Sequence, residues 1–394
     1  MKWIALLLAS GYLASAQAAT INVPSCLLAD VQAAVTRAAA GDTIQIAAGS
    51  CAWSGSISIS GITLSGAGNS TAGTVITGGM VRLTKHSTRP TQLTGFRFTG
   101  TDQHFDVGGS PSGKPFIIAN NYFRADVSSK LGTITTNGGL IHHNEFNAAT
   151  PTNRDVFNIV TSENWSGAPT FGTQDSNGER NIYFEDNVFR GILETMPDGD
   201  AGSRLVIRYN RFIDSSIVFH GGQPTDSSPN GGTRQFEVYN NTFERVSNSA
   251  AINKWIWVRG STGVIANNTM ARAESPDGSS YPNKHEIFLT VGCPTGYPVQ
   301  YQVGQSNVSP ESPPSHPLAI FGNTGPGTSD SNFIDVDGSD TAGPSCATPN
   351  NYIQQGRDFV LSNSWGWTPY VYPHPLQSGQ TTQVPAAPVS LTAL

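Results

Sequence analysis

The sequence predicts an all-β chain wound into a solenoid of short parallel strands, a parallel β-helix. Two observations predict it: a short phrase that returns along the chain, and a two-residue alternation of side chains within each copy. The phrase is an aliphatic stretch followed by Asn, any residue, and an aromatic or apolar residue. Its Asn residues are Asn121, Asn144, Asn187, Asn210, Asn241 and Asn268, and an incomplete copy of the phrase contains Asn323.

The spacing of the phrase is that of a solenoid repeat. Successive Asn residues are 23, 43, 23, 31, 27 and 55 residues apart. If the steps of 43 and 55 each contain two periods with one unmarked turn, every period is between about 21 and 31 residues long, within the range of such repeats. We therefore expect an unmarked coil between Asn144 and Asn187, and another between Asn268 and Asn323.

The alternation within each copy is that of a strand. Leu205, Ile207 and Tyr209 share one face, and Val206 and Arg208 share the other. No convincing amphipathic helix follows residue 45 or so, which excludes alternating strands and helices. The Asn at each bend is expected to bond the backbone of its own turn and the Asn of the next coil. The Phe two positions on is expected to stack in the core.

The N-terminal end of the solenoid needs a cap over about residues 25 to 50, because the first coil otherwise exposes its core and an open edge. We expect a helix over residues 25 to 40, ended by Gly41-Asp42, and then a strand over residues 43 to 46. The apolar residues at helical spacing are Leu28, Val31, Ala34, Val35 and Ala38.

Residues 1 to 18 have the pattern of a secretory signal. Lys2 supplies the positive end, residues 4 to 8 the apolar stretch, and residues 16 to 18 a small-residue cleavage site. No later stretch is long and apolar enough to span a bilayer. We expect a secreted or periplasmic protein with one domain over residues 19 to 376, and a loose, uncharged tail over residues 377 to 394.

The chain has four cysteines, which in an exported protein indicate two disulfides with three arrangements to choose from. Nearness along a solenoid favours Cys26–Cys51, which pins the cap, and Cys293–Cys346, which ties a long excursion. A metal site is the weaker alternative, because no pair has C-x₂-C spacing.

The opening of the chain also resembles a known superfamily. A helix, Gly-Asp-Thr, a strand and Gly-x-Cys, followed by the N-x-F strands, are similar to right-handed, pectate-lyase-like β-helix proteins over roughly residues 25 to 330. The ending WGWTPYVYPHPL, residues 365 to 376, is similar to C-terminal segments of exported bacterial members. The resemblance implies right-handed coils and work on polysaccharides, most often cleavage of uronates by β-elimination.

Two landmarks of the classical pectate lyases are missing from this chain. It has neither their Arg-x-Pro-x-x-Arg segment nor their ladder of paired Asp residues for calcium. Their catalytic residues therefore do not transfer, and a fold alone does not establish a function.

Candidate site residues come from aligning the strands that follow each N-x-F phrase, since equivalent positions on stacked coils lie about 4.8 Å apart. His220-Gly221 and Arg259-Gly260 fall in the same place on neighbouring coils. The catalytic candidates are Arg259, His220 and Lys254 from these strands, and Arg208 from a strand that precedes the phrase. The substrate-binding candidates are Trp255, Trp257, Lys284 and His285 from these strands, and Glu237 from a strand that precedes the phrase. Basic groups and His on adjacent coils suit an acidic sugar, and Trp255 and Trp257, on one face, suit stacking of a sugar ring.

Each candidate has a structural alternative. Arg259 follows an apolar strand, where an Arg needs a partner, and Glu237 is the carboxylate that could pair with it. Arg208 and Lys254 could lie on a solvated face, and His220 could be satisfied within a turn. Buried tryptophans would belong to the core rather than to a sugar platform.

Metal and hydrolase chemistry have weaker support. Residues 197–200 and 335–340 are rich in Asp but lack the full EF-hand series, so we expect surface turns and no metal or cofactor, with calcium left open in the second segment. A glycoside hydrolase needs two carboxylates facing one bond. The alignment puts no two acidic residues at equivalent positions of adjacent coils, which places hydrolysis behind elimination.

Net charge bears on the partner. The charge is −6 and the pI is about 5.7, which argues against nucleic acid and an anionic membrane surface. We expect a monomer that binds an extracellular polysaccharide containing uronate and cleaves it as a lyase, provided that the basic residues are locally concentrated. The competing class is a non-catalytic module for glycan binding, adhesion or structure.

Overall fold

The architecture is described by a computed structural model. It describes residues 17–100, 103–125, 130–148, 157–161, 163, 165, 169–173, 175–191, 197–221, 231–246, 254–271, 285–291, 297–298, 301–307, 309–325, 333–337 and 351–378.

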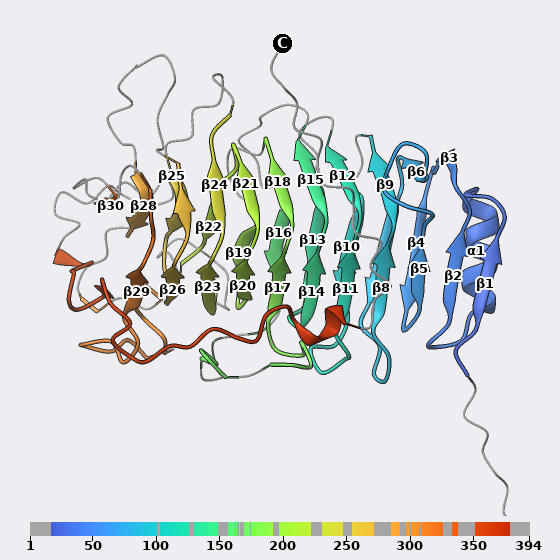
Figure 1. Ribbon diagram of the computed structural model, residues 1–394. Coiled ribbons are helices and arrows are strands. Elements are labelled where there is room, and N and C mark those ends of the chain that lie inside the picture. The colour runs from blue at the N-terminus through green and yellow to red at the C-terminus, as the bar shows by residue number, and fades with distance from the viewer. Residues whose placement is uncertain are drawn as a thin grey trace, which may run out of the picture.

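The chain winds into a solenoid whose stacked coils form three long parallel sheets (Figure 1). Sheet A consists of β1 Thr20–Val23, β2 Thr43–Ile46, β5 Thr63–Ser65, β8 Thr91–Thr94, β11 Phe116–Ala119, β14 Gly139–His142, β17 Ile182–Glu185, β20 Arg204–Arg208, β23 Gln235–Tyr239, β26 Gly263–Ala266, β29 Leu318–Phe321 and β31 Phe359–Val360. Sheet B consists of β3 Gly49–Ala52, β6 Thr74–Thr77, β9 Phe96–Thr99, β12 Tyr122–Ala125, β15 Glu145–Ala148, β18 Val188–Arg190, β21 Arg211–Ile213, β24 Thr242–Glu244 and β27 Thr269–Met270. Sheet C consists of β4 Ser56–Ser60, β7 Met80–Thr84, β10 Phe105–Gly108, β13 Gly132–Ile134, β16 Phe157–Val160, β19 Asp198–Asp200, β22 Ile217–Phe219, β25 Lys254–Val258, β28 His285–Thr290 and β30 Ile334–Asp337.

From β2 to β28 each coil contributes one strand to each sheet, in the order A, B, C, and every strand pairing between neighbouring coils is parallel. Phe123 pairs with Phe146 in sheet B, and Ile118 pairs with Ile141 in sheet A. The protein is a right-handed parallel β-helix, which confirms the predicted fold class.

The predicted Asn ladder forms at the corner between sheets A and B. Asn187 Nδ2 donates to Asn210 Oδ1 at 3.0 Å, and Asn210 repeats this contact with Asn241 at 3.0 Å. Each Oδ1 also accepts the backbone N–H of the preceding Asn, as Asn210 Oδ1 does from Asn187 N at 2.9 Å. The residue before each Asn has a left-handed backbone, for example Tyr209 with φ 57°. This turn satisfies backbone groups that the bend removes from the sheets.

A column of aromatic rings fills the interior next to this ladder, as predicted. Phe123, Phe146, Phe189, Phe212 and Phe243 stack with ring centroids 4.7 to 5.3 Å apart. All five side chains are buried. Burial of large apolar side chains is the main favourable term for such a core.

The prediction of two unmarked coils is wrong. Asn144 Nδ2 donates directly to Asn187 Oδ1 at 3.0 Å, and Asn268 Nδ2 donates to Asn323 Oδ1 at 2.9 Å. The steps of 43 and 55 residues are therefore single coils that carry long connections. The extra residues follow β16 and β28, at the corner where the chain passes from sheet C to sheet A.

The N-terminal cap is the helix α1, Leu28–Arg37, which is shorter at both ends than the predicted 25 to 40. Val31 and Ala34 of α1 are buried in the solenoid core. The Cys26–Cys51 disulfide is confirmed and ties the cap to β3. Cys293 and Cys346 lie outside the described residues, as does the predicted signal apart from residues 17 and 18.

The C-terminal segment, residues 361 to 378, crosses the outer face of sheet A and appears as the red trace along the lower edge of the solenoid (Figure 1). Trp367 packs on Tyr239, and Tyr370 packs on Tyr183. The segment ends in a short 3-10 helix, Pro375–Gln377. Gln377, assigned by sequence to the tail, is buried against Glu185 at 2.7 Å. No helix among the described residues is long and apolar enough to cross a membrane.

Candidate functional site

Two of the predicted catalytic residues meet on the outer face of sheet C. Phe219 of β22 pairs with Val258 of β25, so His220 and Arg259, one residue further on, stand side by side on neighbouring coils. Their apolar neighbours Phe219 and Val258 point into the core and are fully buried. The strand alternation therefore turns His220 and Arg259 outward, as the aligned sequence predicts.

His220 is held from both sides. Its Nε2 lies 3.1 Å from Asp198 Oδ1, and its Nδ1 lies 2.9 Å from Arg259 Nη1. The same Nη1 atom is 3.2 Å from Nε2, a longer approach to an atom that already faces a carboxylate. Because a guanidinium can only donate, Nδ1 accepts. The neutral imidazole therefore carries its proton on Nε2, the atom that faces Asp198.

The surroundings of His220 favour its charged form. Burial by itself lowers the pKa of His220, and Arg259 acts in the same direction. The hydrogen bond to Asp198 and its negative charge outweigh both, so the pKa of His220 is raised. The His220 side chain is 21% exposed while that of Asp198 is 3% exposed. The imidazole of His220 is therefore accessible to solvent, whereas the carboxylate of Asp198 is buried.

Lys254 and Trp257 lie beside this pair on β25. Lys254 Nζ is 4.0 Å and Arg259 Cζ is 5.0 Å from the centroid of the Trp257 ring. Trp257 Nε1 donates to Thr290 Oγ1 at 3.0 Å, and only 8% of the residue is exposed. Trp257 therefore positions two cations. It does not offer the open ring face predicted for stacking a sugar.

Two acidic residues of the site were missed by sequence reasoning. Residues 197–200 were predicted to form a surface turn, but Asp198–Asp200 is the strand β19 of sheet C. Asp198 and Asp200 both occupy outward positions on this strand, next to His220 on the following coil. The signal was present as acidic residues two apart before an N-x-F phrase. It was hidden because the Asp-Gly-Asp sequence of β19 lacks the apolar run that identifies β22 and β25 as strands.

The glycines that follow His220 and Arg259 have a packing role. A Cβ atom on Gly221 would come within 2.2 Å of the Arg259 carbonyl oxygen, and one on Gly260 within 2.3 Å of the Tyr301 carbonyl oxygen. The sequence suggested that these glycines let a ligand approach. The structure shows neighbouring coils in contact there, which explains the glycines without a ligand.

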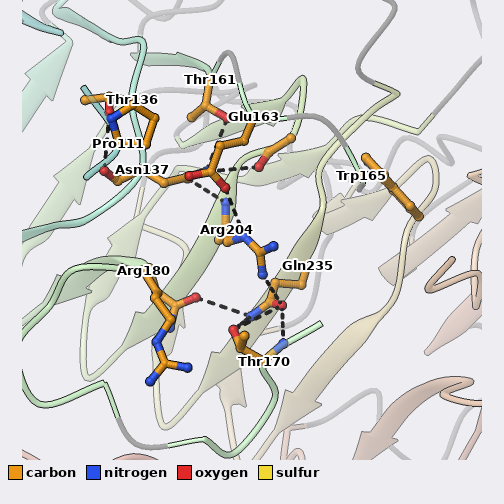
Figure 2. Close-up of polar contacts among 12 residues, drawn as sticks. Pro111, Thr136, Asn137, Thr161, Glu163, Trp165, Thr170, Arg180, Arg204 and Gln235 are labelled. Atoms are coloured by element: carbon orange, nitrogen blue, oxygen red, sulfur yellow. Dashed lines mark hydrogen bonds and ion pairs between the residues drawn. The ribbon is translucent and has the colours of Figure 1, made fainter. Parts of the chain in front are cut away.

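A buried polar network borders the site at the corner between sheets C and A (Figure 2). Arg204 Nε donates to Glu163 Oε2 at 3.2 Å, and Arg204 Nη1 donates to Gln235 Oε1 at 3.1 Å. The Arg204 backbone N–H donates to Asn137 Oδ1 at 3.0 Å. Gln235 Oε1 also accepts the Thr170 backbone N–H at 2.8 Å. These bonds attach the long connection after β16 to the frame of the solenoid.

The same connection reaches the coil of His220. Trp165 Nε1 donates to the Gly232 carbonyl at 3.0 Å, and Thr233, next in the chain, donates its N–H to the His220 carbonyl at 2.8 Å. Trp165 also meets Tyr301 of the connection after β28, with ring centroids 4.5 Å apart. Trp165 and Tyr301, one from each long connection, therefore lie close to the coil of His220.

Arg208 and Glu237 are not part of this site, because they lie on the outer face of sheet A beneath the C-terminal segment. Arg208 is fully buried in an ion pair with Glu185. Glu237 accepts Trp367 Nε1 at 2.8 Å, so the alternative pairing of Arg259 with Glu237 does not form. The sequence predicted Arg208 from the strand before the N-x-F phrase, and this strand, β20, belongs to sheet A and not to sheet C.

The remaining candidates divide between the core and the part of the chain that is not described. Trp255 is fully buried, packs on Phe243 and donates Nε1 to the Ala271 carbonyl at 2.6 Å. The prediction that it shares a face with Trp257 is wrong, because the chain turns a corner as it enters β25. His285 pairs with Lys254 through the backbone, but its side chain and Lys284 lie outside the described residues.

The second Asp-rich segment is also partly a strand. Ile334–Asp337 is β30, and Asp337 pairs with Thr290 in sheet C, while residues 338–340 are outside the described range. Within the described residues, no group of three or more His, Cys, Asp and Glu side chains could hold a metal ion.

Strand pairing and the Asn ladder place the chain in the class of right-handed parallel β-helices. A solved structure titled as an alginate lyase from Paenibacillus sp. str. FPU-7 is similar with a TM-score of 0.33 and 18% identity, over 78% of this chain and 87% of that one. No family model matches the sequence, and no curated protein matches it either. The fold therefore rests on the strand pairing, and the function has to be argued from the site.

Proposed function

We propose that the protein is an exported enzyme that cleaves a uronate-containing polysaccharide by β-elimination, with His220 as the base and Arg259 as the group that holds the uronate carboxylate. One observation carries the proposal: His220 is bonded to Asp198 on one side and to Arg259 on the other, on an outer face of the solenoid. The Cys26–Cys51 disulfide fits an oxidising compartment outside the cytoplasm.

The reaction follows from the hydrogen bonds of this group. A uronate carboxylate competes for the Arg259 guanidinium, since a charged acceptor binds it more strongly than an imidazole does. Arg259 then leaves His220 Nδ1, whose lone pair takes the proton from C5 of the sugar. The electrons of the C5–H bond form the C4–C5 double bond, and the bond from C4 to the glycosidic oxygen breaks. His220 returns its proton to the departing oxygen.

Asp198 and Lys254 assist in this scheme. Asp198 keeps the proton of the neutral ring on Nε2, which leaves Nδ1 as the only basic atom, and it stabilises the imidazolium that forms. Lys254, held over Trp257, adds positive charge where the enolate-like carboxylate becomes more negative.

The test uses single substitutions and the ultraviolet absorbance of unsaturated uronate ends. We expect His220→Ala and Arg259→Ala to lower kcat/KM by about 10²–10⁴-fold, the usual range for a positioned acid–base group. Arg82→Ala is the matched control, because it removes one exposed Arg from β7, at the far end of the same sheet. A folded Arg259→Ala protein with full activity refutes the assignment. A flat trace on every uronate polymer, with reducing ends also unchanged, favours the non-catalytic glycan-binding module.

A glycoside hydrolase is the second candidate, favoured by Asp198 and Asp200. Both occupy outward positions on β19, and residues two apart on a strand are separated by roughly 6.6 Å. This is close to the separation of about 6.5–9.5 Å that inverting hydrolases need between acid and base. New reducing ends without unsaturation, lost in Asp200→Asn, would establish hydrolysis in place of elimination.

A further inference from the structure

The outer face of sheet C continues from His220 toward the N-terminus as two straight rows of side chains. Strand register aligns the rows coil by coil. The first row consists of Ser58, Arg82, Asp106, Thr133, Asn158 and Asp198. The second row consists of Ser60, Thr84, Gly108, Thr135, Val160 and Asp200. We call the parts of these rows on β10, β13 and β16 the neutral track.

The neutral track carries no cation in the rows described. Its side chains are the hydroxyls of Thr133 and Thr135, the amide of Asn158, the small Gly108 and the half-exposed Val160, with Asp106 as the one ionised group. The next residues toward His220 are Asp198 and Asp200. On these rows, the described Lys and Arg side chains nearest to the neutral track are Arg82, on β7, and Arg259, which directly follows β25.

Resting on the function proposed above, we propose that the substrate is a heteropolysaccharide in which the uronate bound at Arg259 is flanked by uncharged sugars, and that these sugars lie on the neutral track. The substrate class is thereby distinguished from a homopolymer of uronates.

The spacing of the coils and the charges on the rows both favour uncharged sugars on the neutral track. A pyranose ring in an extended polymer is about as long as the separation of neighbouring coils, roughly 4.8 Å. A polyuronate lying along these rows would therefore place a carboxylate over almost every coil, including those of β13 and β16, whose outward residues Thr133 and Asn158 offer no positive charge. Desolvating such carboxylates without partners is unfavourable. Hydroxyl and amide side chains match the hydroxyls of a neutral sugar, and Gly108 and Val160 leave room for the apolar face of a ring.

The experiment compares binding and cleavage of four named polymers at low salt: polygalacturonate and alginate as homopolyuronates, deacylated gellan and hyaluronan as polymers whose glucuronates are separated by uncharged sugars. Affinity electrophoresis measures binding, and unsaturated ends measure cleavage. We expect retardation by at least one of the mixed polymers to exceed that by either homopolyuronate about tenfold or more.

A substitution on the track tests its placement. Thr133→Lys puts a cation in the middle of the neutral track, and Thr133→Gln is the matched variant of similar length without charge. Relative to Thr133→Gln, we expect Thr133→Lys to bind homopolyuronate about threefold or more tightly, and we expect high salt to remove the difference because exposed charges are screened.

Each outcome is decisive. Equal or tighter binding of homopolyuronate by the wild-type protein overturns the inference, even if cleavage shows that the proposed elimination occurs. Indistinguishable Thr133→Lys and Thr133→Gln proteins overturn the placement of the polymer on the track. A binding preference for mixed polymers without unsaturated ends supports the inference and refutes the proposed elimination.

Discussion

Replacement of Arg208 by Met should destabilise the fold without touching the chemistry of the site. Arg208 Nε donates to Glu185 Oε1 at 2.7 Å, and Nη2 meets the same carboxylate. Nη1 donates to Tyr239 Oη at 2.8 Å and to the Tyr370 carbonyl at 2.7 Å, while Nη2 donates to the Val371 carbonyl at 2.8 Å. One guanidinium therefore joins sheet A to the C-terminal segment.

The magnitude follows from the burial of the pair. Both side chains are 0% exposed, and removing one partner of a buried ion pair leaves the other charge uncompensated, which costs about 3–5 kcal/mol. Glu185 keeps the His374 N–H at 3.0 Å and Gln377 Nε2 at 2.7 Å, so we expect the lower end of that range. The double variant Arg208→Met/Glu185→Leu removes both charges and should be more stable than Arg208→Met alone.

The assay is urea unfolding followed by tryptophan fluorescence, with cleavage measured on the same preparations at a temperature where each variant is folded. Our reasoning predicts a large loss in the free energy of unfolding, partial recovery in the double variant, and near-normal kcat/KM in both. It is refuted if Arg208→Met loses less than about 1 kcal/mol, or if the folded variant is inactive, which would restore Arg208 to the catalytic group.

Three further outcomes follow from buried groups. Asn210→Ala removes the oxygen that accepts hydrogen bonds from the Asn187 backbone N–H and from Asn187 Nδ2, and it should lower the free energy of unfolding by about 3 kcal/mol. Asn323→Ala, at the half-buried end of the ladder, should lower it by less in the same urea titration. Burial raises the pKa of Glu237 to about 7, so the folded state keeps a proton that the unfolded state has already lost. The free energy of unfolding should therefore fall as pH rises from the ordinary Glu pKa to about 7, and should then become constant. Glu237→Gln should remove this pH dependence. The raised pKa of His220 places the acid limb of the kcat/KM profile above the ordinary His value, and Asp198→Asn should move that limb to lower pH.

The repeating parts of the fold could be predicted because their physics is local. Each Asn bonds the backbone of its own turn and the same residue one coil away, so every coil needs it and the sequence repeats it. The register of His220 and Arg259 could be predicted because each follows an apolar strand and precedes a Gly. The cap and the Cys26–Cys51 disulfide likewise join residues close in sequence.

The number of coils could not be predicted, because corner connections vary in length at little energetic cost. Doubling the length of a flexible loop costs only about 0.6 kcal/mol in closure entropy, so spacing in sequence does not count coils. The step from Asn144 to Asn187 is an example, because it is a single coil where two periods were expected. Asp198 and Asp200 were concealed because β19 is a short Asp-Gly-Asp strand without the apolar run that marks β22 and β25.

The role of Arg208 could not be predicted either, because its partners in the C-terminal segment are 162 and 163 residues away along the chain. In sequence, Arg208 and Arg259 look alike, since each ends an apolar strand of the same solenoid. The difference between them is the sheet to which each belongs. Sheet A is covered by aromatic residues of the C-terminal segment, such as Trp367 and Tyr370. Arg208 on this sheet donates hydrogen bonds to that segment.

Among the described residues, outward side chains on the first strands of sheet C, such as Ser58 and Arg82, are exposed, and this difference between the two sheets bears on where function can reside. A charged group under a cover must be paired within the protein, as Arg208 is, and has nothing left to offer a ligand. A charged group on an accessible face can exchange a partner, and one partner of Arg259 is Nδ1 of His220, a weaker acceptor than a carboxylate. In the proposed reaction an anionic sugar displaces that partner, and the displacement frees the basic nitrogen. The proposal therefore makes binding of the substrate and exposure of the base one event.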